Sequence, residues 1–437
     1  MSTPAIITYL RSLEAIRDRS NQVYKLGQKG KLDHWDFDES QLNEVVTYCI
    51  NIIKRDFGTE YNKIPPHCRR NHFISPDNDR ISKLISQSDF PSTQGPLEKA
   101  KALIDLYLVS VLLDAGAGPR WTYSETDEKG EIIWKGGRSE GLAIASYHMF
   151  ISGLFSDDKE KKYQVNAAGL KKLTPDILAK HLQVSNENPM EGLEGRCNLL
   201  IKLGDALEER TDISKSGRPG DILEYFSTQI TDSKLPLTSF WSTLFELLLP
   251  IWPSRTTLPS HPTESLGDVW LCPSLSKFLN ESNTERKEGD DYVVFHKLTQ
   301  WLCYSLVEAI ESQTEWEIQG NGQTGLPEYR NGGLLVDLDV LTIKSSSLDS
   351  KAYPNGMNNP PVLEPSHPAV IEWRSMTVIS LDKIHELICA KLKVSTKELT
   401  LAQVLEAATW KGGREIAKEK RPGGGPPIDI ISDGTVF

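Results

Sequence analysis

Apolar residues recur at the three- and four-residue spacing of amphipathic helices along most of this chain. The spacing predicts helices over residues 6–16, 41–57, 97–113, 142–155, 237–249, 295–311, 378–392 and 398–418. Ser395 and Glu398 have the spacing of a capping box, in which hydroxyl and carboxylate satisfy backbone amides reciprocally, and they predict the start of the last helix. We therefore expect a mainly α fold.

Strand patterns are few. Residues 121–125 and 131–134 flank the polar turn TDEKG and predict a hairpin, and residues 428–432 predict a short strand. We expect a compact helical body with a few short strands, of which a helical DNA-glycosylase-like arrangement is one form. The expected organisation is a single domain over residues 1–437, with two helical lobes over approximately 1–235 and 236–437 as its subdivision.

The charge balance limits the kinds of partner. The 437 residues carry a formal net charge of -11, with 38% hydrophobic and 25% charged residues, which is the composition of a globular protein. Nucleic acid and anionic membrane both attract a positive surface, so a negative chain disfavours both. We expect a small-molecule partner, and an anionic substrate would need a local cationic pocket.

Cysteine usage and the N-terminal residues indicate the compartment. The six cysteines lie far apart without a C-x-x-C pair, and no basic segment precedes the first short apolar run. No apolar window approaches the roughly 20 residues of a membrane-spanning helix. We expect reduced thiols and a cytoplasmic protein. Metal-binding motifs such as H-E-x-x-H are missing from the sequence, so neither a metal nor another cofactor is expected.

Long sequence words resemble the uracil catabolism protein 4 family of fungi and bacteria. They include C-R-R-N-H-F (68–73), D-A-G-A-G-P-R-W-T-Y-S-E (114–125), L-G-D-V-W (266–270), G-L-P-E-Y-R-N-G-G-L-L-V-D (325–337), E-W-R (372–374) and R-P-G-G-G-P-P-I-D-I-I-S-D-G-T-V-F (421–437). The resemblance implies a role in a pathway that opens uracil without prior reduction. The chain departs from the family pattern at Asn71, where Arg is expected, and at Asp339, where Gly is expected.

A second resemblance concerns the chemistry. F-H-K-L-T-Q-W (295–301) and P-E-Y-R-N-G-G-L-L (327–335) are similar to the paired helix and loop of queuosine-phosphate N-glycosidases. That family has a loop carboxylate before Tyr-Arg, which corresponds to Glu328 before Tyr329 and Arg330, and a helix lysine that corresponds to Lys297. The similarity implies hydrolysis of an N-ribosidic bond.

Carboxylates are the candidate catalytic groups. Cleavage of a ribosyl C–N bond builds positive charge on the sugar, which a nearby carboxylate can stabilise while it activates water. Glu328 is our first candidate for this role and Asp337 the second. Glu140 and Glu125 are alternative proton donors for the departing urea. For each of them an ion pair or a helix cap is the competing interpretation.

The residues around Glu328 favour a ligand-binding turn. Pro327 and the pair Gly332 and Gly333 would let backbone approach a small ligand, and Arg330 can offer a charged fork. The other candidate substrate-binding residues of the family words are Trp121, Tyr329 and Arg374.

The helix over residues 295–311 carries an unusual polar and aromatic face. A helical wheel gathers Lys297, Gln300, Trp301, Tyr304 and Glu308 on one side. Such a face suits a cleft wall that stacks and hydrogen-bonds a ligand. A face packed against another helix, with charged residues at its rim, explains the same pattern.

Basic residues near the C-terminus could hold a phosphate. Residues 411–421 contain five basic and two acidic residues, a net charge of +3. Arg414 and Arg421 could bind bidentately, with the amides of residues 423–425 as an anion-binding nest. A basic helix end followed by a Pro/Gly strap is the competing interpretation. Arg138, in a glycine-containing loop before a helix, is a further phosphate candidate.

The leading hypothesis is therefore an N-ribosidic hydrolase that releases urea from a ring-opened uracil nucleotide such as ribosylurea phosphate. Its expected partner is a small nucleoside or nucleotide carrying phosphate. Two alternatives remain open, which are a non-catalytic scaffold or regulator of the other uracil-degrading enzymes and an amidohydrolase acting on the opened ring.

Overall fold

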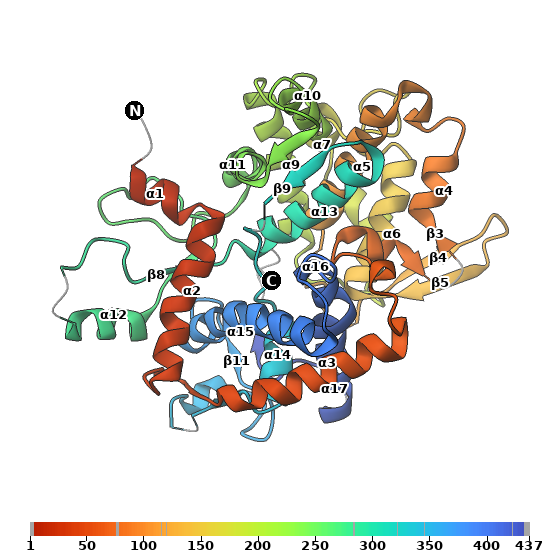
Figure 1. Ribbon diagram of the computed structural model, residues 1–437. Coiled ribbons are helices and arrows are strands. Elements are labelled where there is room, and N and C mark those ends of the chain that lie inside the picture. The colour runs from red at the N-terminus through yellow and green to blue at the C-terminus, as the bar shows by residue number, and fades with distance from the viewer. Residues whose placement is uncertain are drawn as a thin grey trace. The chain divides into compact units, whose positions relative to one another are not determined.

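The computed structural model describes residues 4–75, 78–114, 116–118, 120–282, 285–320, 322–344, 346–421 and 423–431. Helices predominate within these ranges, which confirms the predicted mainly α fold (Figure 1). The longer α-helices are α2 (Leu13–Gln28), α3 (Leu42–Phe57), α5 (Pro96–Leu112), α6 (Arg138–Ile151), α9 (Leu193–Glu209), α11 (Leu237–Leu248), α13 (Lys297–Gln313), α15 (Pro368–Leu392) and α17 (Trp410–Lys420). The shorter ones are α1 (Ala5–Leu10), α4 (Arg80–Ser86), α7 (Ala167–Lys171), α8 (Pro175–His181), α10 (Ile222–Ser227), α12 (Pro273–Glu281), α14 (Tyr329–Asp337) and α16 (Leu401–Val404).

The strands are short and pair two by two. Antiparallel pairs are β1 (Trp35–Phe37) with β10 (Leu341–Ile343), β2 (Ile74–Ser75) with β3 (Asn78–Asp79), β4 (Tyr123–Thr126) with β5 (Ile132–Gly136), and β7 (Val269–Leu271) with β8 (Tyr292–Val294). Parallel pairs are β6 (Lys234–Pro236) with β9 (Glu317–Gln319), and β11 (Val362–Leu363) with β12 (Asp429–Ile430). The β4–β5 hairpin and β12 confirm the predicted strands, although Ser432 lies outside the described residues.

Several predicted helices begin at other residues than expected. Helix α6 begins at Arg138 rather than at residue 142 and α15 at Pro368 rather than at residue 378, and capping residues explain two further cases. The helix expected over residues 6–16 breaks before Leu13, because the Ser12 hydroxyl accepts the amide of Ala15 at 3.2 Å and starts α2. The helix expected from Glu398 begins at Leu401, where Thr400 and Gln403 form the capping box. Ser395 and Glu398 do exchange hydrogen bonds, but they close a turn before that helix.

Contacts divide the described residues into two compact units. Unit 1 is built from Met1–His67, Ser254–Gln300 and Gly322–Ile431, and unit 2 chiefly from Cys68–Pro253 and Trp301–Asn321. Both units combine segments that are distant in sequence. The single domain with lobes divided near residue 235 stays a prediction.

The long helix α15 forms the core of unit 1. Its side chains are buried along most of its first four turns, and it packs against α2, α3 and α14 (Figure 1). A helix that is buried on all sides needs such neighbours, and its polar side chains need partners within the protein. Two indoles add polar anchors, since Trp35 donates to the Ala369 carbonyl at 2.8 Å and Trp373 donates to the Gly332 carbonyl at 2.9 Å.

Glycines allow α14 to lie close to its neighbours, including α17. A methyl group on Gly332 would meet the Trp373 indole at 2.7 Å, one on Gly333 would meet Pro427, and one on Gly413 would overlap the Arg330 carbonyl. The interpretation of Gly332 and Gly333 as a ligand-binding turn is therefore wrong. Both lie inside α14, where protein atoms fill the space beside them.

The departure from the family pattern at Asp339 falls where α14 ends. Asp339 has a φ of 59°, the left-handed conformation that glycine adopts most readily and that Asp tolerates. The amide of the next residue, Val340, donates to the Leu335 carbonyl at 2.8 Å and closes this helix end. The fold thus keeps the backbone shape for which a glycine is expected.

Helix α5 runs through the core of unit 2 and packs against α6 and α9. The charged residues Lys101 and Asp105 are buried on it. Buried charges require partners, and those of α5 lead to the pocket described below. No helix among the described residues combines the length and apolarity needed to cross a lipid bilayer.

We predict that Gly413→Ala destabilises unit 1 by about 1–3 kcal/mol, because the new methyl group has no room against the Arg330 backbone. Chemical denaturation of the full chain measures the change. The matched control is Gly423→Ala, because a methyl group on Gly423 meets no atom within 4 Å. Equal stability of the two variants would contradict the packing described for α14 and α17.

Candidate functional site

One carboxylate in unit 1 connects several of the family words. Asp268 lies just before β7, and its oxygens accept the Arg374 Nη1 and Nη2 at 2.8 and 2.7 Å. They also accept the Trp270 Nε1 at 2.6 Å and the backbone amide of Lys297 at 3.0 Å. Asp268 therefore fixes the first residue of α13 to a buried arginine of α15.

The ion pair between Asp268 and Arg374 strongly favours the charged form of the carboxylate. Burial acts to raise the pKa of Asp268, but the charge and hydrogen bonds of Arg374 outweigh it and hold that pKa well below its usual range. Arg374 is buried, its guanidinium lies 4.0 Å from the centre of the Phe295 ring, and its Nε donates to the Pro327 carbonyl at 3.4 Å. Arg374, a candidate substrate-binding residue, thus holds Asp268 and the loop before Glu328.

Glu328 is the N-cap of α14. Its two oxygens accept the amides of Asn331 at 2.6 Å and Arg330 at 2.8 Å, and the residue is 8% exposed. The Asn331 Nδ2 donates to the Leu326 carbonyl at 3.0 Å, which fixes the approach of the loop. The helix cap was one of the alternatives for this carboxylate. Each oxygen retains capacity for a further hydrogen bond.

Arg330 and Tyr329 begin α14 beside the glycine-rich strap. The Arg330 guanidinium lies 5.0 Å from the centre of the Tyr329 ring, and its Nη1 donates to the Gly424 carbonyl at 2.8 Å. The strap is thereby bound to the start of the helix that carries Glu328.

Two of the predicted site residues bind each other. Asp337 accepts the Arg421 Nη1 and Nη2 at 2.7 and 2.6 Å, and the Arg421 Nε donates to the Gly425 carbonyl at 2.7 Å. The Gly424 amide donates to the Arg421 carbonyl at 2.8 Å, so this amide of the predicted anion nest is used by the strap itself. Arg414 lies over the Trp410 ring, 4.8 Å from its centre.

Sequence reasoning missed a histidine–carboxylate pair in unit 1. The His67 Nδ1 lies 2.6 Å from the Glu406 Oε2, and the Trp410 ring centre lies 5.5 Å from that of His67. Glu406 belongs to a π-helical turn, Leu405–Thr409, inserted between α16 and α17. Hydrophobic periodicity does not reveal a single π turn, and π turns frequently mark functional sites.

The polar face of α13 is packed. Gln300 is buried, its Nε2 donates to the Phe295 carbonyl at 3.1 Å and to the Thr324 hydroxyl at 3.0 Å, and its Oε1 accepts the Thr324 amide at 3.0 Å. In unit 2, Trp301 and Tyr304 are buried as well, and the His72 ring meets the Trp301 indole edge-on at 5.6 Å. These contacts are those of a packed face.

The remaining candidates lie in unit 2. Glu125 accepts the Arg80 Nε at 2.9 Å, contacts the Arg80 Nη2, and meets the His148 Nε2 at 3.0 Å. Burial acts to raise the pKa of Glu125, but hydrogen bonds and charges of His148 and Arg80 lower it to about 2. Trp121 is buried and donates its Nε1 to the Leu182 carbonyl at 2.9 Å.

Arg138 and Glu140 open helix α6. Arg138 is exposed and has a φ of 53°, a left-handed conformation at the first helical position. Glu140 is half-buried and close enough to act on the charge of Arg69, which is itself buried and pairs with Asp114 at 2.6 Å. Glu140 and Arg138 therefore belong to unit 2, whereas Glu328 belongs to unit 1.

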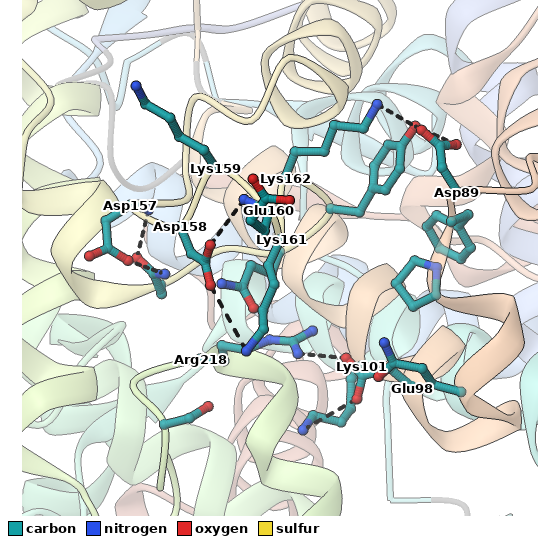
Figure 2. Close-up of a pocket in the computed structure, with 17 residues that line it drawn as sticks. Asp89, Glu98, Lys101, Asp157, Asp158, Lys159, Glu160, Lys161, Lys162 and Arg218 are labelled. Atoms are coloured by element: carbon teal, nitrogen blue, oxygen red, sulfur yellow. Dashed lines mark hydrogen bonds and ion pairs between the residues drawn. The ribbon is translucent and has the colours of Figure 1, made fainter.

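A polar pocket of about 600 Å³ lies within unit 2 (Figure 2). Its charged lining residues are Asp89, Glu98, Lys101, Asp157, Asp158, Lys159, Glu160, Lys161, Lys162 and Arg218. None of the residues predicted for the site lines it. Across the described ranges, no group of three or more His, Cys, Asp or Glu side chains is placed to hold a metal ion.

Comparison with known proteins gives full-length matches. A family model described as protein of unknown function (DUF1688) matches residues 9–437. Uracil catabolism protein 4 of Lachancea kluyveri is 38% identical over 448 residues, which cover 99% of both chains. Protein urg3 of Schizosaccharomyces pombe is 40% identical over 441 residues, which cover 100% of both chains.

We predict that Asp268→Asn lowers the free energy of unfolding by about 3 kcal/mol or more, because it leaves the buried Arg374 without a charged partner. Denaturant unfolding measures the loss, with the exposed Asp36→Asn as the matched control. A loss no greater than that of the control would contradict the role given to this ion pair.

Glu125 should contribute to acid sensitivity. Its folded pKa of about 2 lies below its ordinary value of 4.5, so its stabilising contribution is complete above about pH 4.5 and is lost as the pH falls toward 2. We expect the stability difference between wild type and Glu125→Gln to shrink over that interval. Unfolding by denaturant at several pH values measures it, with the exposed Glu131→Gln as control. A difference independent of pH would count against the assignment.

Proposed function

We propose that this chain, which belongs to the DUF1688 family of proteins of unknown function, takes part in uracil catabolism. The observation that carries the proposal is the full-length similarity to a relative named uracil catabolism protein 4. Similarity over the whole length supports a shared role better than similarity over one segment would, because the core and both units are matched together.

The reaction that we propose is hydrolysis of the N-ribosidic bond of a ring-opened uracil nucleotide, for example ribosylurea phosphate. The oxygen of water bonds to C1′ of the ribose as the C1′–N bond breaks, and urea leaves with the bonding pair and a proton. The products are urea and a ribose phosphate. Positive charge develops on the sugar in the transition state, so a fixed carboxylate near C1′ would accelerate the reaction.

Glu328 is the residue that we propose for this carboxylate. Two backbone amides at the amino end of α14 hold its oxygens in place, and a helix amino end favours a negative charge there. A side chain held in this way does not need to reorganise when charge develops on the substrate, which is the main advantage of a preorganised site.

The link between Glu328 and Lys297 supports the resemblance to N-glycosidases. Asp268 binds the amide of Lys297 at the start of α13, and its partner Arg374 binds the Pro327 carbonyl just before Glu328. One ion pair therefore fixes both segments that carry the resemblance. In this proposal Lys297 contacts the substrate from the start of α13.

Asp337, another predicted catalytic group, takes a supporting role in the proposal. Asp337 is engaged by Arg421, and together they hold the strap whose Gly424 carbonyl binds Arg330. We therefore assign Asp337 to positioning. We give Glu140 no role beside Glu328 in this proposal, because the two residues belong to different units.

A non-catalytic role in the same pathway is the second candidate. The observation that favours it is the mutual pairing of charged groups, since Asp268, Asp337 and Glu125 each hold an arginine. A carboxylate held in such a pair stabilises the fold and is not free to act on a substrate, which is compatible with a scaffold or regulator. This candidate requires no bond cleavage by the purified protein.

The test is release of urea from ribosylurea phosphate by the purified chain. We expect Glu328→Gln to lower kcat by about 10²-fold or more, because a neutral amide does not stabilise developing positive charge. Its melting temperature is measured alongside and should fall moderately, because the amide nitrogen of Gln cannot accept and one of the two cap hydrogen bonds is lost. The matched control is the exposed Glu364→Gln, which should retain wild-type kcat.

Two results would contradict these proposals separately. If the wild type binds ribosylurea phosphate but releases no urea, the hydrolase proposal fails and the non-catalytic role gains support. If Glu328→Gln releases urea at the wild-type rate, the reaction stands and the assignment of Glu328 fails.

A further inference from the structure

The pocket of unit 2 has the size of a small-molecule site. It encloses about 600 Å³, within the range of about 300–1,000 Å³ typical of ligand pockets. Its walls come from residues 89–101, residues 157–166, and Ser216 with Arg218. We call it the Arg218 pocket, after the buried arginine that lines it (Figure 2).

Most acidic side chains of the Arg218 pocket are engaged by neighbours in the protein. Asp89 accepts Lys162 at 2.8 Å and the Tyr163 hydroxyl at 3.1 Å, and Asp157 accepts the Asn166 Nδ2 at 2.7 Å. Carboxylates that are already hydrogen-bonded present less free negative charge to a ligand. The cations of the lining are the groups to consider next.

Arg218 has one donor nitrogen left over. Its Nε donates to Asp105 at 3.0 Å and its Nη1 to Glu98 at 2.6 Å, and the residue is only 8% exposed. Its Nη2 is buried without a hydrogen-bond partner among the described residues. A buried donor that lacks an acceptor is unfavourable, so an incoming acceptor at this position is favoured.

The amino end of α5 lies beside the Arg218 pocket. The helix begins at Pro96 after Gly95, and no side chain caps it. Gln94 before this end and Glu98 in the first turn both line the Arg218 pocket. The helix dipole is positive at this end and favours negative charge, and the Glu98 carboxylate of the first turn already uses part of that attraction.

Lys161 can add a mobile positive charge. Its side chain is 70% exposed, and its ion pair with Asp158 is long at 3.9 Å. In Figure 2 the Lys161 side chain runs from its loop toward Arg218. A lysine on a flexible stem can leave such a weak partner for an anion that Arg218 binds at the same time.

From these observations we infer that the Arg218 pocket binds the phosphate group of a small sugar phosphate. Arg218 and Lys161 bind the phosphate oxygens beside the start of α5. The polar lining residues Tyr163, Gln164 and Gln94 suit the hydroxyl groups of the sugar. This site is separate from the proposed role of Glu328 and does not depend on it.

Isothermal titration calorimetry of the full chain with D-ribose 5-phosphate tests the inference. We expect saturable binding to the wild type, weaker binding of D-gluconate, which presents a carboxylate in place of phosphate, and no binding of unphosphorylated ribose. Lys161→Glu should weaken the affinity for ribose 5-phosphate by at least about 10-fold, because it replaces an attractive charge by a repulsive one. The matched control is Lys202→Glu, an exposed charge reversal in unit 2 outside the lining, which should keep wild-type affinity.

A second variant tests the role of the buried Arg218 separately from that of Lys161. Arg218→Lys keeps the charge beside Glu98 and Asp105 but removes the spare guanidinium nitrogen, so it should also weaken binding. Its melting temperature is measured alongside, and Lys161→Glu decides the question if Arg218→Lys does not fold.

Three outcomes would overturn the inference. They are no binding of ribose 5-phosphate by the wild type, equal affinity of Lys161→Glu and Lys202→Glu, and tighter binding of gluconate than of ribose 5-phosphate. Urea release from ribosylurea phosphate is measured in a separate assay on the wild type. Calorimetry therefore tests the phosphate-binding inference, and the urea assay tests the proposed reaction independently.

Discussion

The ion pair of Asp268 and Arg374 is the constraint on which the arrangement of unit 1 depends. Removing two charges from water is costly, and the cost is offset only when geometry is good and the remaining hydrogen-bonding capacity is used. Both conditions are met here. The Trp270 indole and the Lys297 amide donate further hydrogen bonds to the Asp268 carboxylate, and the Pro327 carbonyl accepts one from the Arg374 Nε. The start of α13, the loop before α14 and the second turn of α15 are positioned together as a result.

The sequence predicted local structure well and long-range contacts poorly. The helices α3, α5 and α11 and the β4–β5 hairpin follow from apolar spacing and turn residues, which act over a few positions. Asp268 and Arg374 are 106 residues apart, and no periodicity connects them. The glycines were equally ambiguous in the sequence, because a tight turn and a close contact between helices both favour a residue without a side chain. Gly332 and Gly333 satisfy the second requirement.

The candidate site shows the same division. The family words singled out Glu328, Asp337 and Arg421 as chemically important. The structure shows that Glu328 binds backbone amides and that Asp337 and Arg421 bind each other. The Arg218 pocket could not be found in this way. The sequence around Lys161 and around Glu98 is typical of a solvent-exposed surface. Only the folded structure brings the two residues to one pocket.

The π-helical turn at Leu405–Thr409 makes chain length itself a structural variable. A π turn holds about one residue more than an α turn, and each residue of an α-helix rotates the chain by about 100°. That additional residue sets the rotation of Glu406 about the helix axis relative to Gly413. Glu406 contacts His67, and Gly413 packs against the Arg330 carbonyl. Shortening this segment by one position would turn one surface away from its neighbour whatever amino acids remained, so the number of residues here matters as much as their identity.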